Sequence, residues 1–223
     1  MQILERLPGE TGRDYALRTI KDNIIHLELE PGSLVSENEL AAEMGLSRTP
    51  VREALIELAK VKMIQIQPQR RSTVAPIDYT LVEESRFMRS VLECAVVQLD
   101  CEMAVSADLQ RLDENIRLQR FYLENGKPEA LLDLDNSFHR MLFAIAQKSQ
   151  VYTLIQTISI HFDRVRHMAL GSVKDLKIVD DHAAILEAIA QKQPDRARQL
   201  TQRHLNRYKI DEASIRKTYP QYF

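Results

Sequence analysis

The stretch ENELAAEMGLSRTPVREALIEL, residues 37–58, decides the fold of the N-terminal part of the chain. It predicts two short helices joined by a tight turn at Gly45, because glycine readily adopts the positive φ that such a turn requires. Ser47 is placed to cap the second helix, and Pro50 falls in its first turn, where a missing N–H costs little. Apolar residues recur at helical spacing along one face of that helix: Val51, Ala54, Leu55 and Leu58.

The opposite side of the second helix is cationic near its N-terminus, where Arg48, Thr49 and Arg52 lie. Together with Ser47, these residues have the layout of a recognition helix, whose first residues reach base edges and phosphates in the major groove of DNA. An ordinary surface hairpin with solvated arginines would show the same spacing. The two helices alone therefore leave both interpretations open.

The residues that follow favour the DNA-binding interpretation. Residues 63–67 (MIQIQ) alternate apolar and polar as a half-buried strand does, residues 68–72 predict a turn, and residues 73–75 predict a returning strand. Arg70 and Arg71 lie at the tip of this hairpin. Two helices followed by a basic β-hairpin make a winged helix, whose wing lies along the DNA backbone or in the minor groove.

A longer stretch that includes these elements, PGSLVSENELAAEMGLSRTPVREALIELAKVKMIQIQPQRRSTV, resembles the DNA-binding domain of the GntR family of bacterial transcription regulators. The shared features are the Pro-Gly start, the SRTPVREAL core and the arginines of the wing, and the resemblance covers about residues 13–77. It implies a winged helix-turn-helix. Two positions depart from the family pattern, which usually has glycine where this chain has Lys62 and Arg71.

Positive charge is local in this chain, since the formal charge of all 223 residues is only -2. Between residues 48 and 71 there are six Lys and Arg against two Glu, which suits reversible, salt-sensitive binding to DNA. No apolar run approaches the ~20 residues of a membrane span, and the N-terminus lacks a signal-peptide pattern. We therefore expect a cytoplasmic protein with no membrane partner.

Two domains and a mainly α fold are expected, with the winged helix-turn-helix in residues 1–77 and a helical domain in residues 78–223. In the first domain, residues 1–11 predict a loose tail and residues 13–29 predict a helix that supports the hairpin. In the second, apolar periodicity and helix breakers predict an all-α bundle of six helices with short connections. The expected helices are 78–103, 106–125, 128–147, 149–170, 173–191 and 194–217.

Four residues of the expected bundle are candidate metal ligands. Asp135 and His139 are four apart on one helix, so both side chains project from one face, while His182 and His204 each lie where a later helix turns apolar. Three histidines and one carboxylate suit a borderline divalent ion with room for water or a ligand oxygen. Each histidine on its own is more often an exposed or hydrogen-bonded core residue than a metal ligand.

The motif D-x-x-x-H of residues 135–139, followed by DHAAILEAI and RHL, resembles the FCD effector domain of the FadR-type branch of the GntR family. The resemblance covers about residues 80–215, includes the RxxLE motif that begins at Arg89, and is strongest to the short, VanR-like members. In metal-binding members the four matching positions hold a divalent ion. The resemblance thus implies zinc first, with nickel or manganese as alternatives, at Asp135, His139, His182 and His204.

The resemblance further implies a ligand-controlled regulator, most simply a repressor, in which a small carboxylate or sugar acid binds the metal and shifts the helices. It also implies a homodimer that reads an inverted repeat in double-stranded DNA, since pairing lengthens the contact that specificity requires. A carboxylate ligand needs a cationic clamp, for which Arg89, Arg164 and Arg166 are candidates, with His161 beside them. The alternative for these arginines is an ordinary salt bridge.

Two other functions fit parts of the sequence. The metal could be structural or could itself be the signal, with no organic effector. A metal-dependent hydrolase could also use three histidines, an aspartate and an activated water. We do not expect an enzyme, because no general base is evident beside the ligand set and a winged helix would then have no role.

Overall fold

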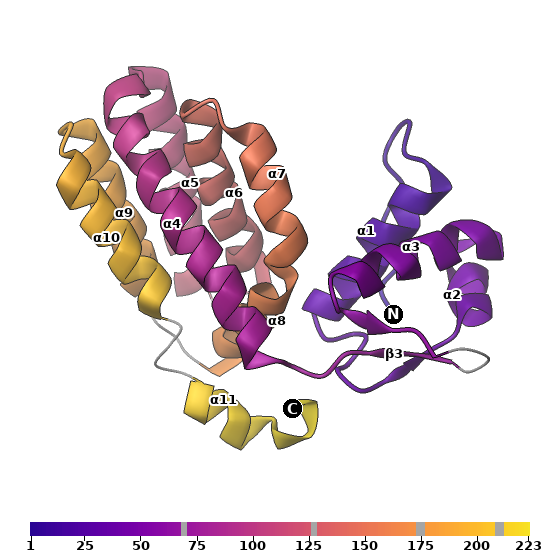
Figure 1. Cartoon of the computed structure of the whole chain (residues 1–223). Coiled ribbons are helices and arrows are strands. Elements are labelled where there is room, and N and C mark those ends of the chain that lie inside the picture. Colours follow the sequence, from indigo (N-terminus) through magenta and orange to yellow (C-terminus); the bar gives the residue numbers. More distant parts are fainter. Residues whose placement is uncertain (68–70, 126–128, 173–176, 208–211) are drawn as a thin grey trace. The chain divides into compact units, whose positions relative to one another are not determined.

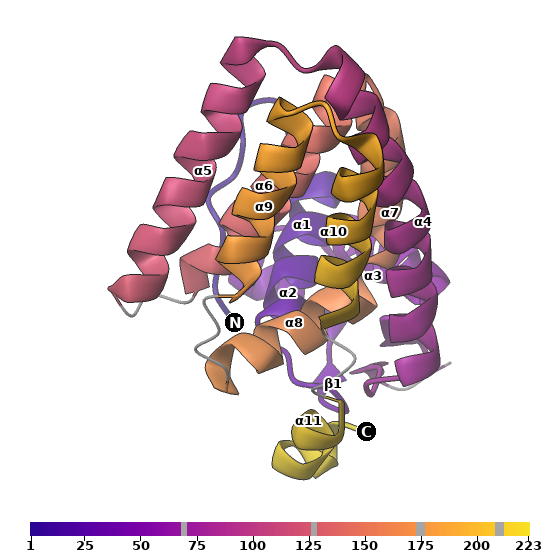
Figure 2. The same cartoon turned by 90° about the vertical axis from the view of Figure 1, so that its left-hand side faces the viewer.

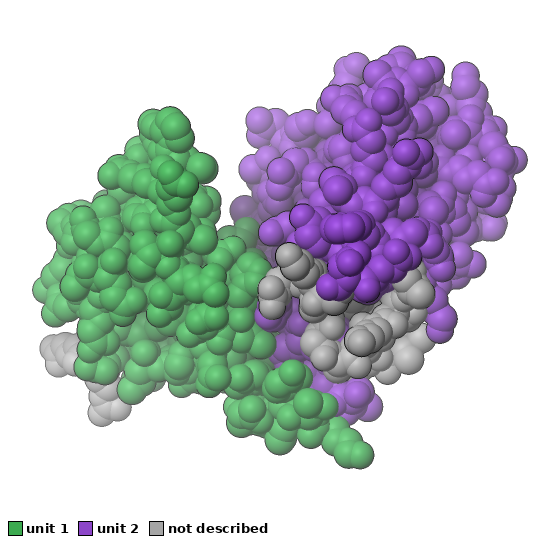
Figure 3. Space-filling model, turned by 180° about the vertical axis from the view of Figure 1, so that it is seen from behind, with its two compact units in different colours: residues 1–79, 216–223 green, residues 80–215 purple. Residues whose placement is uncertain are grey.

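The computed structural model describes residues 1–67, 71–125, 129–172, 177–207 and 212–223 (Figure 1). The chain forms two compact units, one of residues 1–79 with 216–223 and one of residues 80–215 (Figure 3). The boundary expected after residue 77 lies two residues from the boundary in the structure. Residues 216–223 belong to the first unit, although the sequence predicts them in the second.

The first unit is a three-helix domain with a small antiparallel sheet, in the strand order β1-β3-β2. Leu34 of β1 pairs with Thr73 of β3, and Ile64 of β2 pairs with Val74 on the other edge of β3. The strand β1 was not expected from the sequence, because two residues give no detectable alternation. The elements are α1 (Gly12–Ile25), β1 (Leu34–Val35), α2 (Glu37–Met44), α3 (Arg48–Lys60), β2 (Ile64–Gln65) and β3 (Ser72–Val74).

The turn between α2 and α3 follows the expected chemistry in most respects. Gly45 ends α2 in the left-handed region at φ 65°, which a side chain would make costly. Ser47 is the N-cap residue of α3, but its side chain makes no capping hydrogen bond, so the expected cap is wrong in this detail. The predicted inner face of α3 is confirmed, since Val51, Ala54, Leu55 and Leu58 are all buried.

The N-terminal residues are packed against α1, so the expectation of a loose tail is wrong. The side chain of Asn23, which is fully buried, accepts a hydrogen bond from the Gln2 amide at 2.6 Å and donates to the Gln2 carbonyl at 2.8 Å. Arg18 holds the Glu10 carboxylate through two contacts of 2.8 Å. These pairs are separated by 8 to 21 residues, which is why a local pattern does not reveal them.

The C-terminal residues complete the first unit. The Ile77 amide donates to the Tyr222 carbonyl at 2.7 Å, and the Tyr222 hydroxyl donates to Glu30 at 3.1 Å. The rings of Tyr79 and Phe223 stack with centroids 5.6 Å apart, and the guanidinium of Arg216 lies 4.8 and 4.6 Å from their centroids. These contacts explain why the last eight residues group with the N-terminal unit.

The second unit is an all-α bundle, as expected (Figures 1 and 2). In it α5 packs against α6 and α9, α10 packs against α9, and α8 crosses the lower end of the bundle in Figure 2. Its core comes from most of the helices and includes Val97, Leu112, Phe138 and Ile185. The helices are α4 (Tyr79–Met103), α5 (Ser106–Glu124), α6 (Glu129–Ile145), α7 (Ser149–Ile158), α8 (Ile160–Ser172), α9 (Lys177–Ala190) and α10 (Pro194–Asn206).

Two predicted helices of the bundle are divided in the structure. The expected helix 149–170 is divided at Ser159 into α7 and α8, and the Ser85 hydroxyl of α4 lies 2.8 Å from the Ile158 carbonyl oxygen at this break and 2.8 Å from the Leu81 carbonyl oxygen of its own helix. The expected helix 194–217 ends as α10 at Asn206, and α11 (Glu212–Thr218) is separate, followed by a short 3-10 turn (Pro220–Tyr222). The starts expected at residues 128 and 173 lie outside the described residues.

Within the described part of the chain, no helix is both long enough and apolar enough to cross a membrane.

Candidate metal centre and DNA-binding surface

The four predicted metal ligands lie together inside the second unit. Asp135 and His139 come from α6, His182 from α9 and His204 from α10, and each is at most 5% exposed. One donor atom from each residue lies within 4.8 Å of the donors of the other three. Among the described residues, this is the one group of His, Cys, Asp and Glu that is arranged to hold a metal ion.

The spacing of the donor atoms fits a small divalent ion. The Nε2 of His204 lies 3.2 Å from that of His182 and 3.3 Å from that of His139. The carboxylate oxygens of Asp135 lie 3.5 Å from the Nε2 atoms of His139 and His182. A tetrahedral ion with bonds of about 2.0–2.1 Å has edges of about 3.3 Å between its ligands. Four donor distances thus match the size of such an ion.

The other ring nitrogen of each histidine faces an acceptor. The Nδ1 of His182 lies 2.8 Å from Oε1 of Gln119, and the amide nitrogen of Gln119 donates to Asn115 at 2.7 Å, which fixes the direction of the Gln119 carbonyl. The Nδ1 of His139 lies 2.7 Å from a Glu93 carboxylate oxygen. With Nδ1 of both rings protonated, their Nε2 lone pairs point at one another across the cluster. A shared cation is the simplest partner for that arrangement.

The outer contact of His204 is longer. Its Nδ1 lies 3.8 Å from Oδ2 of Asp181, a carboxylate that also pairs with Arg203 at 3.1 Å and with Arg207. Arg207, together with the hydrogen-bonding contribution of His204, outweighs the effect of burial and holds the pKa of Asp181 below its usual range, so this acceptor is ionised. All three histidines therefore have a side-chain oxygen on their outer side.

Electrostatics set the charge states that a metal site needs. Burial lowers the pKa of His182 well below 6.5 and also lowers that of His204, so both rings are neutral near pH 7. Burial opposes ionisation of Asp135, but the cationic Arg166 outweighs it and holds the pKa of Asp135 well below its usual range. The cluster thus offers the neutral imidazoles of His182 and His204 and the carboxylate of Asp135, which are donor types suited to zinc, nickel or manganese.

Two of the candidate effector arginines flank the cluster. Arg166 donates to Asp135, and also to Asn136 at 2.9 Å and Asp163 at 2.8 Å. Arg89 donates to Glu93 at 2.7 Å, and Glu93 in turn faces His139. Their guanidinium carbons lie 5.3 Å (Arg89) and 5.6 Å (Arg166) from the Phe162 ring centroid, and coulombic repulsion between the two cations adds to the cost of burying them there.

The other two candidates pair with each other. Arg164 is fully buried, its Nη2 lies 3.4 Å from Nδ1 of His161, and burial lowers the pKa of Arg164 to about 10. Because residues two apart on a helix differ by about 200° in direction, Arg164 and Arg166 face different sides of α8. The structure thus brings Arg89 and Arg166 to the cluster and places Arg164 with His161 elsewhere on α8.

Sequence reasoning missed Gln119 as a part of this site and gave Glu93 no role in it. Glu93 is 1% exposed, and burial, which alone would raise its pKa, is outweighed by Arg89 and His139, so the pKa falls to about 2. Gln119 and Asn115 are buried polar residues four apart on α5. Two polar residues on the inner face of an amphipathic helix are the signal that would have identified them.

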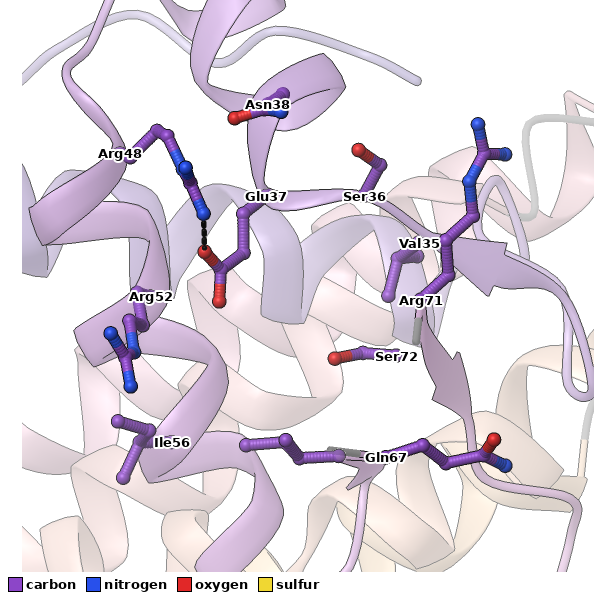
Figure 4. A pocket seen from close by; sticks show the side chains of 11 residues that line it. Val35, Ser36, Glu37, Asn38, Arg48, Arg52, Ile56, Gln67, Arg71 and Ser72 are labelled. Atoms are coloured by element: carbon purple, nitrogen blue, oxygen red, sulfur yellow. Dashed lines mark hydrogen bonds and ion pairs between the residues drawn. The ribbon is translucent and has the colours of Figure 1, made fainter. Parts of the chain in front are cut away.

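The first unit carries a groove of about 620 Å³ between α2, α3 and the sheet (Figure 4). Arg48 and Arg52 of α3 line it on one side and Arg71 on the other, as Figure 4 shows. The predicted residues Ser47 and Thr49 are exposed at the start of α3. Arg70, also predicted to contact DNA, lies outside the described residues.

The two departures from the glycine pattern differ in the structure. Lys62 has φ 59°, in the left-handed region where glycine is favoured, so the backbone is strained at this residue, which carries a Cβ atom. Arg71 is not among the described residues with positive φ. The arginine at the wing therefore adds charge to the groove without a backbone cost of that kind.

Comparison with known proteins identifies the family. A family model described as bacterial regulatory proteins, gntR family, matches residues 15–74, and a model of the FCD domain matches residues 84–207. The HTH-type transcriptional repressor RspR of Escherichia coli (strain K12) is 30% identical over 217 residues, which cover 97% of this chain and 95% of that protein. The chain belongs to the GntR family of transcription regulators. It is therefore a DNA-binding regulator and not an enzyme, which sets aside the hydrolase.

Other similarities agree with this GntR and FCD assignment. An uncharacterised HTH-type regulator of Streptomyces ambofaciens is 32% identical over 219 residues, covering 96% of this chain and 91% of that protein. Among solved structures, E. coli McbR/YncC superposes with a TM-score of 0.80 at 20% identity, covering 94% of this chain and 99% of that one. A GntR regulator from Rhodococcus sp. RHA1 gives 0.74 at 22% identity, covering 93% and 98%. At these identities the structures support the fold.

Proposed function

We propose that this GntR-family regulator binds a divalent metal ion at Asp135, His139, His182 and His204, and that a small carboxylate or sugar acid bound there controls its affinity for operator DNA. The observation that carries the proposal is the convergence of three Nε2 atoms and a carboxylate, with donor distances of 3.2–3.5 Å. Zinc fits this donor set first, and nickel or manganese also accept imidazole and carboxylate ligands.

The arginines beside the cluster support a carboxylate as the effector. A bound divalent ion would supply a Lewis-acid anchor for one carboxylate oxygen. Arg166 already holds a carboxylate, that of Asp135, and Arg89 holds that of Glu93. A ligand carboxylate that took over a part of either contact would shift α4, α6 or α8, the helices that carry these groups. Arg164 and His161 stay candidates for the distal end of the ligand.

Control of DNA binding requires that the effector bind two arrangements of the protein with different affinity. We further propose a cytoplasmic homodimer whose two recognition helices read an inverted repeat, because one recognition helix contacts only a few base pairs. Repression is the proposed sign of regulation, in line with the name of RspR.

A second candidate function is a metal-responsive regulator with no organic effector. It is favoured by the state of Arg166, whose guanidinium is engaged by three side chains, those of Asp135, Asn136 and Asp163. In that version the metal itself stabilises the arrangement of α6, α9 and α10, and the arginines serve to orient Asp135.

The experiment that tests both versions is thermal unfolding of the purified full chain against a panel of small carboxylates and sugar acids, with and without a chelator. Selective binding raises the melting temperature by mass action, by an amount that grows with ligand concentration. The effector version predicts an acid that stabilises the metal-loaded chain and has no effect after chelation. His182→Ala should remove both responses, while His26→Ala, in the first unit, should keep them.

The outcomes separate the possibilities. A melting temperature that falls on chelation but responds to no acid supports the metal-responsive version. A chain whose melting temperature ignores zinc, nickel, manganese and chelator alike overturns the metal site and with it both versions.

A further inference from the structure

Two arginines that line the groove between α2, α3 and the sheet are paired with carboxylates from α2. Arg48 donates to Oε2 of Glu37 at 3.0 Å, and Arg71 donates to Oε1 of Glu39 at 2.8 Å (Figure 4 shows the first pair). Glu37 itself lines the groove between Arg48 and the sheet. A surface that binds a polyanion would bind it more tightly without these acidic groups, so their presence needs a reason other than affinity.

In the Arg48–Glu37 pair, the glutamate restricts the conformations of the arginine side chain. The side chain of Arg48 is 67% exposed and that of Glu37 is 28% exposed, so the carboxylate is the better anchored partner. An exposed arginine with no partner samples many rotamers, and a carboxylate at 3.0 Å reduces that freedom. Glu37 thus restricts the orientations of the Arg48 guanidinium over the groove.

A base contact and a phosphate contact of Arg48 would affect its ion pair with Glu37 differently. A guanidinium has five N–H donors, and Glu37 accepts from one terminal nitrogen of Arg48. The remaining donors can still form the two hydrogen bonds that O6 and N7 of guanine accept, so a base contact leaves the pair intact. A phosphate group instead competes with Glu37 for the same charge and lies close to the glutamate carboxylate, which repels it.

We propose that Glu37 is a specificity-determining residue, which orients Arg48 for a base contact and penalises its use as a general phosphate anchor. The inference rests on the proposed role of Arg48 as a residue that reads a base. Glu39 differs in its partner, because Arg71 belongs to the wing, which lies along the DNA backbone or in the minor groove, where contacts carry little sequence information.

The test compares three glutamates of α2 that lose the same charge. Glu37→Gln breaks the pair with Arg48, and Glu39→Gln breaks the pair with Arg71. Glu43→Gln is the matched control, because Glu43 is an exposed residue of the same helix that faces the N-terminal ammonium at 3.7 Å and does not line the groove. Thermal unfolding of each variant is measured to check that the fold is kept.

The probes are duplexes. Selection from a randomised pool with the wild-type chain yields one bound duplex, and a scrambled duplex of the same composition reports nonspecific binding. For Glu37→Gln we expect about two- to fivefold tighter binding to the scrambled duplex, the range of an exposed ion pair. We expect no gain on the selected duplex, and a salt dependence on scrambled DNA steeper by about one phosphate contact.

The controls decide the interpretation. Glu39→Gln should strengthen binding to both duplexes equally and keep their ratio, and Glu43→Gln should change neither. A Glu37→Gln chain that keeps the wild-type ratio, or that behaves as Glu39→Gln does, overturns the role of Glu37. Arg48→Ala separates this failure from a failure of the underlying assignment, because an Arg48→Ala chain that keeps the ratio would show that Arg48 does not read a base.

Discussion

The Nδ1 atom of His182 lies 2.8 Å from the side-chain oxygen of Gln119, so the Gln119 amide selects the tautomer whose Nε2 lone pair faces the cluster. Gln119→Leu removes that acceptor while keeping a similar volume. We expect zinc affinity to fall about tenfold to a hundredfold, the usual effect of losing such an outer contact. Competition with a chromophoric chelator measures it. Gln110→Leu, on the exposed side of the same helix, should keep wild-type affinity, and an equal loss in both variants would contradict this role for Gln119.

The recognition helix gives a second prediction. Arg48→Ala and Arg52→Ala should each reduce binding to the selected duplex by about tenfold to a hundredfold, the value of a good bidentate base contact. Both side chains are exposed, so the thermal stability should not change. A gel shift measures the binding, with Arg117→Ala as the control, since Arg117 is an exposed arginine of the second unit. Wild-type binding by either groove variant would remove that arginine from the recognition surface.

Lys62 lies at φ 59°, a conformation that costs a residue with a Cβ more than it costs glycine. Lys62→Gly should therefore raise the stability of the first unit, by about 0.5–1 kcal/mol after the entropy of glycine in the unfolded chain is deducted. Urea unfolding measures the change. Lys60→Gly provides the contrast, because residue 60 is helical and glycine there should lower the stability by about 1 kcal/mol. A loss of stability in Lys62→Gly would mean that the lysine side chain makes a stabilising contact.

The buried carboxyl group of Asp100 predicts that the free energy of unfolding depends on pH. It is fully buried in α4, neither carboxylate oxygen has a hydrogen-bond partner in the described part of the chain, and burial with the nearby charge of Asp108 raises its pKa to about 8. In the unfolded chain an aspartate titrates near about 3.9, so the unfolded state loses its proton first. The contribution of Asp100 to stability is therefore most favourable below about pH 4 and is lost as the pH rises toward about 8.

Asp100→Asn should remove this dependence. At about pH 7 the gain in unfolding free energy has an upper limit of about 4 kcal/mol, since three pKa units at about 1.36 kcal/mol separate that pH from the unfolded value. Urea unfolding at about pH 5 and about pH 7 measures the difference, which should be small in the variant and large in the wild type. Asp113→Asn, at a partly exposed position of α5 that pairs with Arg117, should keep the wild-type slope. A pH slope that survives in Asp100→Asn would assign it to another group.

The C-terminal residues should stabilise the DNA-binding unit. Deleting residues 216–223 removes the carbonyl that accepts from the buried Ile77 amide, and an unsatisfied buried donor costs about 1–3 kcal/mol. Hydrogen exchange across α1 to β3 should accelerate in the deletion. Tyr222→Phe, which loses only the hydroxyl contact with Glu30, should cost about 0.5–1.5 kcal/mol. Unchanged exchange in the deleted chain would make these contacts incidental.

The sequence predicted those features that depend on residues close together in the chain. Gly45 and the inner face of α3 follow from local spacing, and Asp135 with His139 follows from the four-residue repeat of a helix. Assembly of His182 and His204 with that pair was expected from the resemblance to the FCD domain, because spacing alone gives no relation between α6, α9 and α10.

The features that the sequence did not predict depend on distant partners. Asn23 holds Gln2 across 21 residues, Gln119 reaches His182 across 63, and Ser85 contacts the last residue of α7 from 73 residues away. The residues around Ser159 keep a helical pattern of apolar side chains, so the break leaves no local trace. The C-terminal contacts are of the same kind, since Tyr222 and Glu30 are 192 positions apart.

The first unit is built from two segments of the chain, residues 1–79 and residues 216–223, so the chain passes between the two units twice. A DNA-binding unit formed by one continuous segment can be exchanged as a single stretch of sequence, whereas a unit formed by two segments cannot. A chimera that joins residues 1–79 to a foreign sensor would leave the Ile77 amide and the Tyr79 ring without their partners from the C-terminus. A functional transfer of this DNA-binding unit to another protein therefore requires residues 216–223 as well as residues 1–79.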